Sequence, residues 1–493
     1  MARHMTPDEF RRHGHQLVDW IADYWATLDR RPVAATDPPG TVAGRLPAGP
    51  PERGEPFDRL LADLDTVIAP GLTHWQHPRF FGYFPANTSG PSVLGDLVCA
   101  GLGVQGMLWS TGPACTEVET VVLDWLAELL DLPARFRSAG TGGGVIQDSA
   151  SSAILIAVLA ALHRAGDGRW RGHGVRRAYR VYTSTQGHSA IEKAVRIAGL
   201  GDAGLRTVGV DPQNLALDPV ALRQAVEADL AAGLVPAAVV ATIGTTSTNA
   251  VDPIPAIGEL CREYGLWLHV DAAYAGAAAV CPELRHTHAG LEYADSYCFD
   301  PHKWLLTGFD CDAFWVADRA ELVEALTVLP EYLRNAATES GAVLDYRDWQ
   351  VPLGRRFRAL KLWFVLRWYG AEGLRAHIRE TIALAGWFAE RVRADPRFEV
   401  VAPGPFALVC FRLAGTGDGA ADDEANAELL ARVNGTGRAY LTHTRVGGRY
   451  TLRLVPGSPY TRQEHVAQTW QLITEVAATL GPPDRSRPTG PGR

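Results

Sequence analysis

The side chains available for amine chemistry are few, because the chain holds only three lysines, Lys193, Lys303 and Lys361. The other 44 of its 47 basic residues are arginines, which stay protonated and do not form Schiff bases. Lys193 lies on the polar face of a predicted helix, and Lys361 can extend from a buried helix to solvent. Lys303 instead follows an aromatic, strand-like run. A lysine becomes nucleophilic when burial lowers its pKa, so Lys303 is the candidate for carbonyl–amine chemistry.

A carboxylate near Lys303 would complete one kind of site, because pyridoxal phosphate accepts electrons only while its ring nitrogen is protonated. Asp271 follows the strand-like run 266–270 and could hold that proton. Two unit charges about 4 Å apart, at an effective dielectric constant of about 20, attract by roughly 4 kcal/mol. That energy corresponds to about 3 pKa units for a pyridinium. The alternative role for Asp271 is an ordinary helix N-cap.

A glycine- and serine-rich segment, residues 140–152 (GTGGGVIQDSASS), leads directly into an apolar helix predicted at 153–163. The free N–H groups at a helix N-terminus bind phosphate well. The segment lacks the Gly-Lys-Ser/Thr of a Walker loop, and Val145 occupies the last glycine position of a G-x-G-x-x-G motif. The segment is therefore either a phosphate site of another kind or a plain glycine-rich turn.

Strand-like and helical segments alternate through the middle of the chain, which indicates an α/β domain with a mostly parallel sheet. The predicted strands are 180–183, 237–243, 266–270, 296–299 and 313–316. Ligands of such sheets bind at the carboxyl ends of the strands. Four of the candidate residues follow these strands, namely His188, Thr246, Asp271 and Lys303.

The ends of the chain differ from this middle part. Residues 6–9 (TPDE) form a capping box that begins a helix with a long apolar stripe, for which we expect a partner surface, preferably on a second subunit. The aromatic stretch 74–85 is either a core plug or a wall for a flat apolar ligand. At 493 residues, two or three domains are expected. We assign 1–88 to an N-terminal helical dimerisation segment, 89–365 to a large domain, 366–480 to a small α+β domain and 481–493 to a disordered tail.

Composition excludes several classes of protein. A net charge of −8 without any basic run argues against nucleic-acid binding. No signal peptide is visible, and the longest apolar run, 153–162, is too short to span a bilayer. Seven scattered cysteines without a CxxC pair indicate reduced thiols and a cytoplasmic protein. The histidine pairs lack an obvious third ligand, so we expect no metal, and no G-x-S-x-G elbow of a serine hydrolase occurs.

The chain resembles the pyridoxal-phosphate-dependent aromatic L-amino acid decarboxylases (group II), which include the DOPA and tryptophan enzymes. The matching stretches are HWQHPRFFGYFP, GPACTEVETVVLDWL, GGGVIQDSASSA, TIGTT, LWLHVDAAYAG, PHKWLLTGFDCDAFWV and VPLGRRFRALKLWF. The resemblance implies fold type I, with a mostly parallel seven-stranded sheet in the large domain, an N-terminal helical segment and a small α+β domain. It also implies a homodimer whose active sites lie at the subunit interface.

The resemblance further implies roles for individual residues. Lys303 would bind pyridoxal 5'-phosphate as a Schiff base, Asp271 would hold its ring nitrogen, and His188 would stack on the ring. Tyr332, on a polar segment expected to be mobile, would protonate Cα after carbon dioxide leaves. The other implied cofactor contacts are Ser149, Ala150, Ser151, Thr246, Ala273, Asp300 and His302.

Two positions depart from the family pattern. Asp300 stands where the animal enzymes typically have asparagine near the phosphate. An ionised Asp300 would repel the phosphate, so it must be protonated, be turned away or bond another group. Ala86 stands where animal DOPA decarboxylases place a threonine hydroxyl against the catechol, which weakens the case for a catechol substrate.

The resemblance therefore implies decarboxylation of a bulky aromatic L-amino acid, with tryptophan or phenylalanine at least as good as DOPA. The residues implied for the substrate pocket, some of them from the neighbouring subunit, are Trp75, Tyr83, Phe84, Pro85, Ala86, Gln105, Met107, His188 and Gly354. An aromatic acetaldehyde synthase on the same scaffold is the alternative, although that branch commonly replaces the loop tyrosine or the stacking histidine. A non-catalytic pyridoxal-phosphate carrier is a third reading, opposed by the presence of Lys303, Tyr332 and Arg355.

Overall fold

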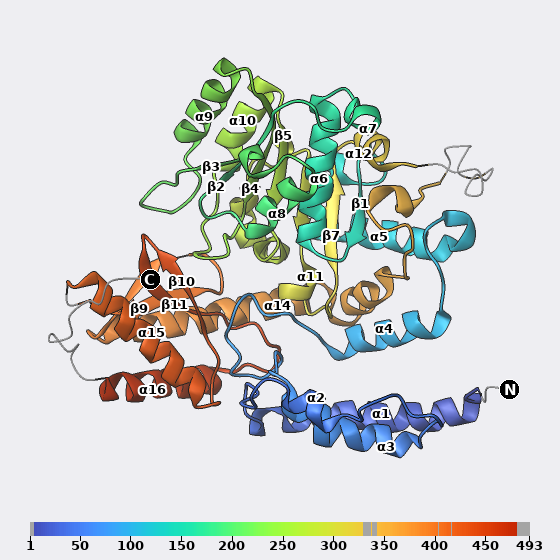
Figure 1. Cartoon of the computed structure of the whole chain (residues 1–493), viewed down its shortest axis with the longest axis vertical. Helices are drawn as coiled ribbons and strands as arrows, with labels where there is room; N and C mark the ends of the chain where they lie inside the picture. The colour runs from blue at the N-terminus through green and yellow to red at the C-terminus, as the bar shows by residue number, and fades with distance from the viewer. Residues whose placement is uncertain (1–3, 329–336, 338–342, 403, 416, 481–493) are drawn as a thin grey trace. The chain divides into compact units, whose positions relative to one another are not determined.

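The computed structural model describes residues 4–328, 337, 343–402, 404–415 and 417–480 (Figure 1). The chain divides into two compact units. We call Ala86–Gly386 with Val400–Cys410 the sheet unit, and Met1–Pro85 with Trp387–Glu399 and Phe411–Arg493 the terminal unit. The domain boundaries at 88/89 and 365/366 stay predictions.

The sheet unit is built on seven strands in the order β1-β7-β6-β5-β4-β2-β3. β7 runs antiparallel to both of its neighbours, and the other strand pairs of this sheet are parallel, so the predicted α/β class is confirmed. The strands are β1 (Gly143–Gln147), β2 (Tyr179–Ser184), β3 (Leu205–Val208), β4 (Val235–Thr242), β5 (Trp267–Asp271), β6 (Ser296–Phe299) and β7 (Asp312–Val316).

Helices cover this sheet. α6 packs on the central strands and contacts α8 and α12, while α5 packs on β1, and α9 and α10 pack on β3, β4 and β5. Apolar side chains of α6 and of the strands form a continuous buried core. The helices of this unit are α4 (Gly90–Leu102), α5 (Pro113–Leu129), α6 (Ala150–Ala165), α7 (Trp170–His173), α8 (Ser189–Ile197), α9 (Pro219–Ala231), α10 (Ile254–Tyr264), α11 (Pro301–Trp304), α12 (Arg319–Leu326) and the first part of α14 (Ala359–Ala394).

One element differs from what the sequence predicts. β1 occupies the middle of the glycine-rich segment, where a side chain at Gly144 would come within 2.7 Å of Trp315 Nε1, so only glycine lets the strand approach β7. The two helices predicted at 357–368 and 374–392 are confirmed as the two parts of α14, which are separated at Gly370, whose φ of 60° and ψ of 177° are not helical.

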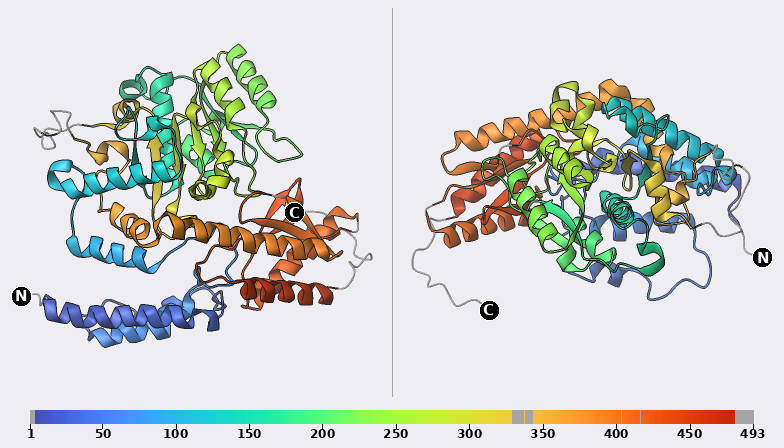
Figure 2. Two further views of the ribbon diagram at one scale, coloured as in Figure 1. Left: turned by 180° about the vertical axis from the view of Figure 1, so that it is seen from behind. Right: turned by 90° about the horizontal axis from the view of Figure 1, so that it is seen from above.

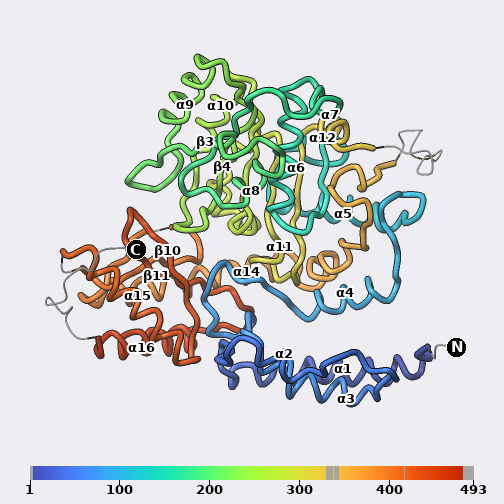
Figure 3. Tube along the Cα trace, in the orientation of Figure 1, coloured from blue at the N-terminus to red at the C-terminus, as the bar shows by residue number. Residues whose placement is uncertain are grey.

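The terminal unit begins with α1 (Pro7–Thr27), whose predicted capping box between Thr6 and Glu9 is present. α1 lies beside α3 (Phe57–Asp63), as Figure 2 shows from behind, and Figure 3 traces the connector with α2 (Thr41–Arg45) between them. Gln16 donates to Asp58 and Trp20 donates to Asp65, so α1 and α3 run parallel. No described residue of α1 is fully buried.

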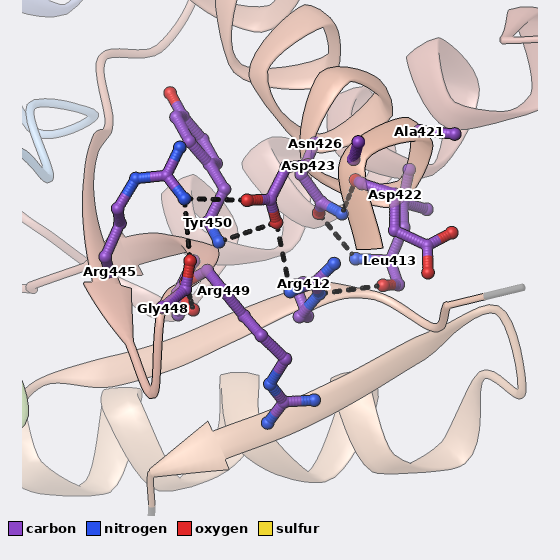
Figure 4. A network of polar contacts seen from close by, with 12 residues as sticks. Arg412, Leu413, Ala421, Asp422, Asp423, Asn426, Arg445, Gly448, Arg449 and Tyr450 are labelled. Carbon is purple, nitrogen blue, oxygen red and sulfur yellow. Dashed lines mark hydrogen bonds and ion pairs between the residues drawn. The ribbon is translucent and has the colours of Figure 1, made fainter. Parts of the chain in front are cut away.

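The other part of the terminal unit contains a polar network at its surface (Figure 4). Asp423 accepts hydrogen bonds from the Tyr450 N–H (2.8 Å) and Arg445 Nη1 (2.7 Å), and lies 3.4 Å from Nη1 of the buried Arg412. The network joins α15 to the strands β9, β10 and β11. The helices of this part are α15 (Gly419–Gly435) and α16 (Gln463–Thr479). The second sheet has the strand order β10-β11-β9-β8, and its strands are β8 (Phe398–Ala402), β9 (Val409–Leu413), β10 (Thr442–Val446) and β11 (Arg449–Leu454). Residues 400–402 of β8 and 409–410 of β9 are counted with the sheet unit.

Among the described residues, none of the helices combines the length and the apolar character needed to cross a bilayer.

Candidate functional site

The sheet unit brings the predicted lysine and carboxylate together at the carboxyl ends of neighbouring strands. β5 ends at Asp271, and β6 ends one residue before Asp300, after which Lys303 lies in α11. Asp271 is 3 % exposed, and its Oδ1 accepts the N–H of Ala273 at 2.9 Å. Burial raises the pKa of Asp271, and the charge of Lys303 and the hydrogen bond from the Ala273 N–H oppose that rise. The lysine and the carboxylate are therefore close enough to interact electrostatically.

Lys303 is held by an acid. Its Nζ lies 2.7 Å from Asp300 Oδ2, and a quarter of its side chain stays exposed. Burial alone would lower the pKa of Lys303, but the charge of Asp300 outweighs burial and raises it. The lysine is thus kept as an ammonium ion in the free protein.

The contacts of Asp300 show which of the three expected arrangements (protonated, turned away or bonded to another group) its acidic side chain adopts. Besides Lys303, it accepts the N–H of Ala150 at 3.1 Å, and His302 Nε2 lies 3.7 Å away. Asp300 therefore bonds other groups, and one of them is the first amide of α6, where the sequence predicts phosphate binding.

The remaining predicted phosphate residues lie at the same helix start. Ser149 is the N-cap of α6, and its hydroxyl donates to Asp148 Oδ1 at 3.1 Å. Ala150 is buried, whereas Ser151 is exposed. The glycine-rich segment thus provides a helix N-terminus beside Lys303, although Gly143 and Gly144 lie in β1.

His188 and Thr246 both lie after strands, as predicted, and both are exposed in the single chain. His188 is the N-cap of α8, and its Nδ1 accepts the N–H of Ala190 at 3.1 Å. The neutral imidazole must then carry its hydrogen on Nε2. This bond fixes the orientation of a ring that is open on its other side. Ala273 is half-buried two residues after Asp271.

Two residues of the site were missed by the sequence prediction. Asp312, at the start of β7, is fully buried, and burial together with the negative charge of the neighbouring Asp300 raises its pKa. The sequence feature that could have revealed Asp312 is its position as a charged residue directly before the predicted apolar strand 313–316. Asn87 donates through its backbone N–H to the carbonyl of His302 at 2.5 Å and through Nδ2 to that of Lys303 at 3.4 Å. Nothing in the local sequence marks Asn87.

The family described as pyridoxal-dependent decarboxylase conserved domain matches residues 39–414 of the chain. The chain belongs to the pyridoxal-dependent decarboxylase family. It is 46% identical over 478 residues to phenylacetaldehyde synthase of Arabidopsis thaliana, which covers 97% of each protein. It is 46% identical over 486 residues to tryptophan decarboxylase TDC2 of Camptotheca acuminata, covering 97% of this chain and 96% of that protein. The crystal structure of Oryza sativa TDC with PLP and tryptamine matches with a TM-score of 0.94 and 43% identity, covering 97% of this chain and 99% of that chain.

This decarboxylase uses pyridoxal 5'-phosphate and has fold type I, and the residues at the sheet edge fit that cofactor. Lys303 offers the amine, the buried Asp271 offers a carboxylate for the ring nitrogen, and the start of α6 offers N–H groups to the phosphate. When bound, the cofactor supplies an electron sink for the bond to the substrate carboxylate.

The residues predicted to contact the substrate lie in both units of the decarboxylase. In the terminal unit, Trp75 stacks on Tyr83 with ring centroids 5.4 Å apart, and Tyr83 has a positive φ of 59°. In the sheet unit, Gln105 Oε1 accepts the N–H of Met107 (3.2 Å) and of Arg355 (2.8 Å). The structure thus brings Gln105 and Met107 close to the Gly354–Arg355 segment. The substrate roles of Trp75, Tyr83, Phe84, Pro85, Ala86, Gln105, Met107, His188 and Gly354 stay predictions, and Tyr332 lies outside the described residues.

A buried ion pair holds the segment that follows Gly354. Arg355 Nη2 contacts Glu119 and donates to the Ile146 carbonyl at 2.9 Å, and both charged side chains are 2 % exposed. Because removing one partner leaves a buried charge alone, Glu119→Gln should lower the free energy of unfolding by about 3–5 kcal/mol. Urea unfolding measures this loss.

The exposed pair of Arg379 and Glu283, whose atoms approach to 2.7 Å, is the matched control. Glu283→Gln should cost far less than Glu119→Gln, because solvent screens an exposed pair. Equal losses in the two variants would contradict the role given to burial.

Proposed function

We propose that this decarboxylase converts an aromatic L-amino acid into the corresponding arylalkylamine and carbon dioxide. The observation that carries the proposal is the placement of Lys303, Asp271 and the α6 N-terminus at one sheet edge, in a chain that aligns over nearly its whole length with a tryptophan decarboxylase. The crystallised Oryza sativa TDC was solved with tryptamine, an arylalkylamine.

Each side chain then has a defined task. Asp271 would hold the cofactor's ring nitrogen in its protonated form, and Lys303 would hold the cofactor through its side-chain amine. His188, fixed through Nδ1, offers the open face of its imidazole to the cofactor ring. Tyr332 donates the proton that replaces the departing carboxyl group. Trp75, Tyr83, Phe84 and Pro85 supply apolar surface for the aromatic ring, and Ala86 offers no hydroxyl to a catechol.

We also propose a homodimer with the active site at its interface. Apolar side chains that a monomer would leave in water support it, among them Phe10 of α1, 58 % exposed, and Leu97 and Leu102 of α4, 50 % and 55 % exposed. All seven cysteines are free and buried, which supports a cytoplasmic location.

An aromatic acetaldehyde synthase is the second candidate, because phenylacetaldehyde synthase of Arabidopsis thaliana is as similar to the chain as the tryptophan decarboxylase is. That reaction couples decarboxylation to oxidative deamination: it consumes molecular oxygen and water and releases aldehyde, carbon dioxide, hydrogen peroxide and ammonia. The presence of both Tyr332 and His188 favours the decarboxylase.

The test compares five substrates with added pyridoxal 5'-phosphate, namely tryptophan, phenylalanine, tyrosine, DOPA and glutamate. We expect kcat/KM for tryptophan or phenylalanine to equal or exceed that for DOPA, and that for glutamate to be lower by about 100-fold or more, because an apolar pocket leaves a second carboxylate unpaired. Amine, aldehyde and hydrogen peroxide are measured together. Glutamate as the best substrate would overturn the aromatic assignment, and stoichiometric aldehyde and peroxide would show the synthase.

A further inference from the structure

Two buried acids face one another beside Lys303. β6 and β7 are antiparallel with Phe299 opposite Ala313, so Asp300 and Asp312 are the next opposing residues. Asp300 is 2 % exposed, and Asp312 is fully buried. Among the described residues, no N–H or O–H group donates to either oxygen of Asp312, while burial and the neighbouring Asp300 carboxyl raise its pKa. Since two negative charges at one buried site strongly disfavour each other, we infer that one of the two acids is protonated.

The charge of this pair lies where an anion would bind. Asp300 Oδ1 accepts the N–H of Ala150, the first residue of α6, and its Oδ2 contacts Lys303 Nζ. The N-terminus of α6 attracts anions through its free N–H groups and its dipole. A phosphate at this helix start would approach the Asp300 carboxylate and compete with it for the same donor.

We propose that Asp300 and Asp312 form a carboxyl pair that holds one proton in the free enzyme and takes up a second when the cofactor phosphate binds at the start of α6. The pair thereby couples cofactor binding to pH. The proposal concerns the cofactor site and holds whichever amino acid is the substrate.

The groups around the pair set the direction of this effect. Burial alone would raise the pKa of Asp300, but the charges of Lys303 and His302 outweigh burial, so the pKa of Asp300 is lowered. The pKa of Asp312 is raised by burial and by the negative charge of Asp300. The titratable groups that interact with the pair lie on β5, β6 and α11 and directly before β7, and they are Asp271, Tyr297, Cys298, His302, Lys303 and Cys311. An arriving phosphate adds negative charge, so the pair binds its second proton more readily. Phosphate affinity should therefore fall as pH rises, by up to about tenfold per pH unit for one proton.

Titration calorimetry of the cofactor-free protein with inorganic phosphate tests the proposal without forming a Schiff base. Runs between pH 8 and 9, where phosphate stays a dianion, in buffers of different ionisation enthalpy give the number of protons taken up. We expect about one proton for the unsubstituted protein. Asp300→Asn should take up none, bind at least about tenfold more tightly at pH 8.5 and lose the pH dependence. An Asp300→Asn protein with unchanged affinity and unchanged proton uptake would overturn the proposal.

Two further variants complete the test. Asp312→Asn keeps a hydrogen-bond donor and the single negative charge, so its phosphate affinity at pH 8.5 should stay within about threefold of the unsubstituted protein. A tightening of tenfold or more would show that both acids are ionised and would overturn the shared proton. Asp310→Asn is the matched control, because Asp310 lies nearby in sequence but pairs with Arg358 at 2.9 Å. An Asp310→Asn effect equal to that of Asp300→Asn would show a general charge effect and also overturn the proposal.

Discussion

Replacement of Lys303 by alanine is expected to lower kcat/KM for the preferred amino acid by about 10⁴-fold or more, because the covalent link to the cofactor is lost. Neither of the other lysines can take its place. Lys193 is exposed on α8, and Lys361 is buried and ion-paired with Asp96 at 3.3 Å. Amine release and bound cofactor are the quantities to measure.

Lys303→Arg distinguishes the effect of losing the positive charge from the effect of losing the Schiff base. Arginine keeps a cation beside Asp300 and Asp271 but cannot form a Schiff base, so it should fold like the unsubstituted protein and be as inactive as the alanine variant. Lys193→Ala should keep full activity. Borohydride reduction followed by peptide mass spectrometry should place the cofactor on Lys303, and a label on Lys193 or Lys361 would contradict the assignment.

The sequence is sufficient to predict the residues that follow strands. Asp271 and Lys303 come after apolar runs that could only be buried strands, and a mostly parallel sheet brings the carboxyl ends of its strands to one edge. The rarity of lysine reduced the candidates further. Chain order and composition therefore contain the information needed for this part of the site.

Contacts that depend on register are not predictable in the same way. Asp300 and Asp312 meet because β7 runs antiparallel to β6, and a shift of one residue would turn Asp312 to the other face. Glu119 and Arg355 are 236 positions apart and meet only through the packing of α5 on β1. Gly144 is required by its approach to Trp315, a tertiary contact that the local sequence does not reveal.

Asp271→Asn is expected to lower kcat by about 10³-fold, because the amide removes the charge that keeps the ring nitrogen protonated. The attraction of roughly 4 kcal/mol between charges about 4 Å apart corresponds to about three powers of ten. In the free protein burial raises the pKa of Asp271, and a cationic ring nitrogen would favour its ionised form. Loss of activity with retained cofactor, measured by kcat and by cofactor content, is the expected result.

A cofactor whose ring nitrogen is methylated gives the deciding measurement for Asp271, because its positive charge does not depend on a carboxylate. Asp271→Ala leaves room for the methyl group. We expect kcat of this variant to be at least about tenfold higher with the methylated cofactor than with the ordinary one. Asp252→Asn is the matched control, since Asp252 is a buried acid that accepts the N–H groups of Leu217 (2.7 Å) and Thr242 (2.8 Å). Any activity lost in Asp252→Asn comes from the fold and should not be restored by the methylated cofactor. Equal restoration in both variants, or none in Asp271→Ala, would contradict the role of Asp271.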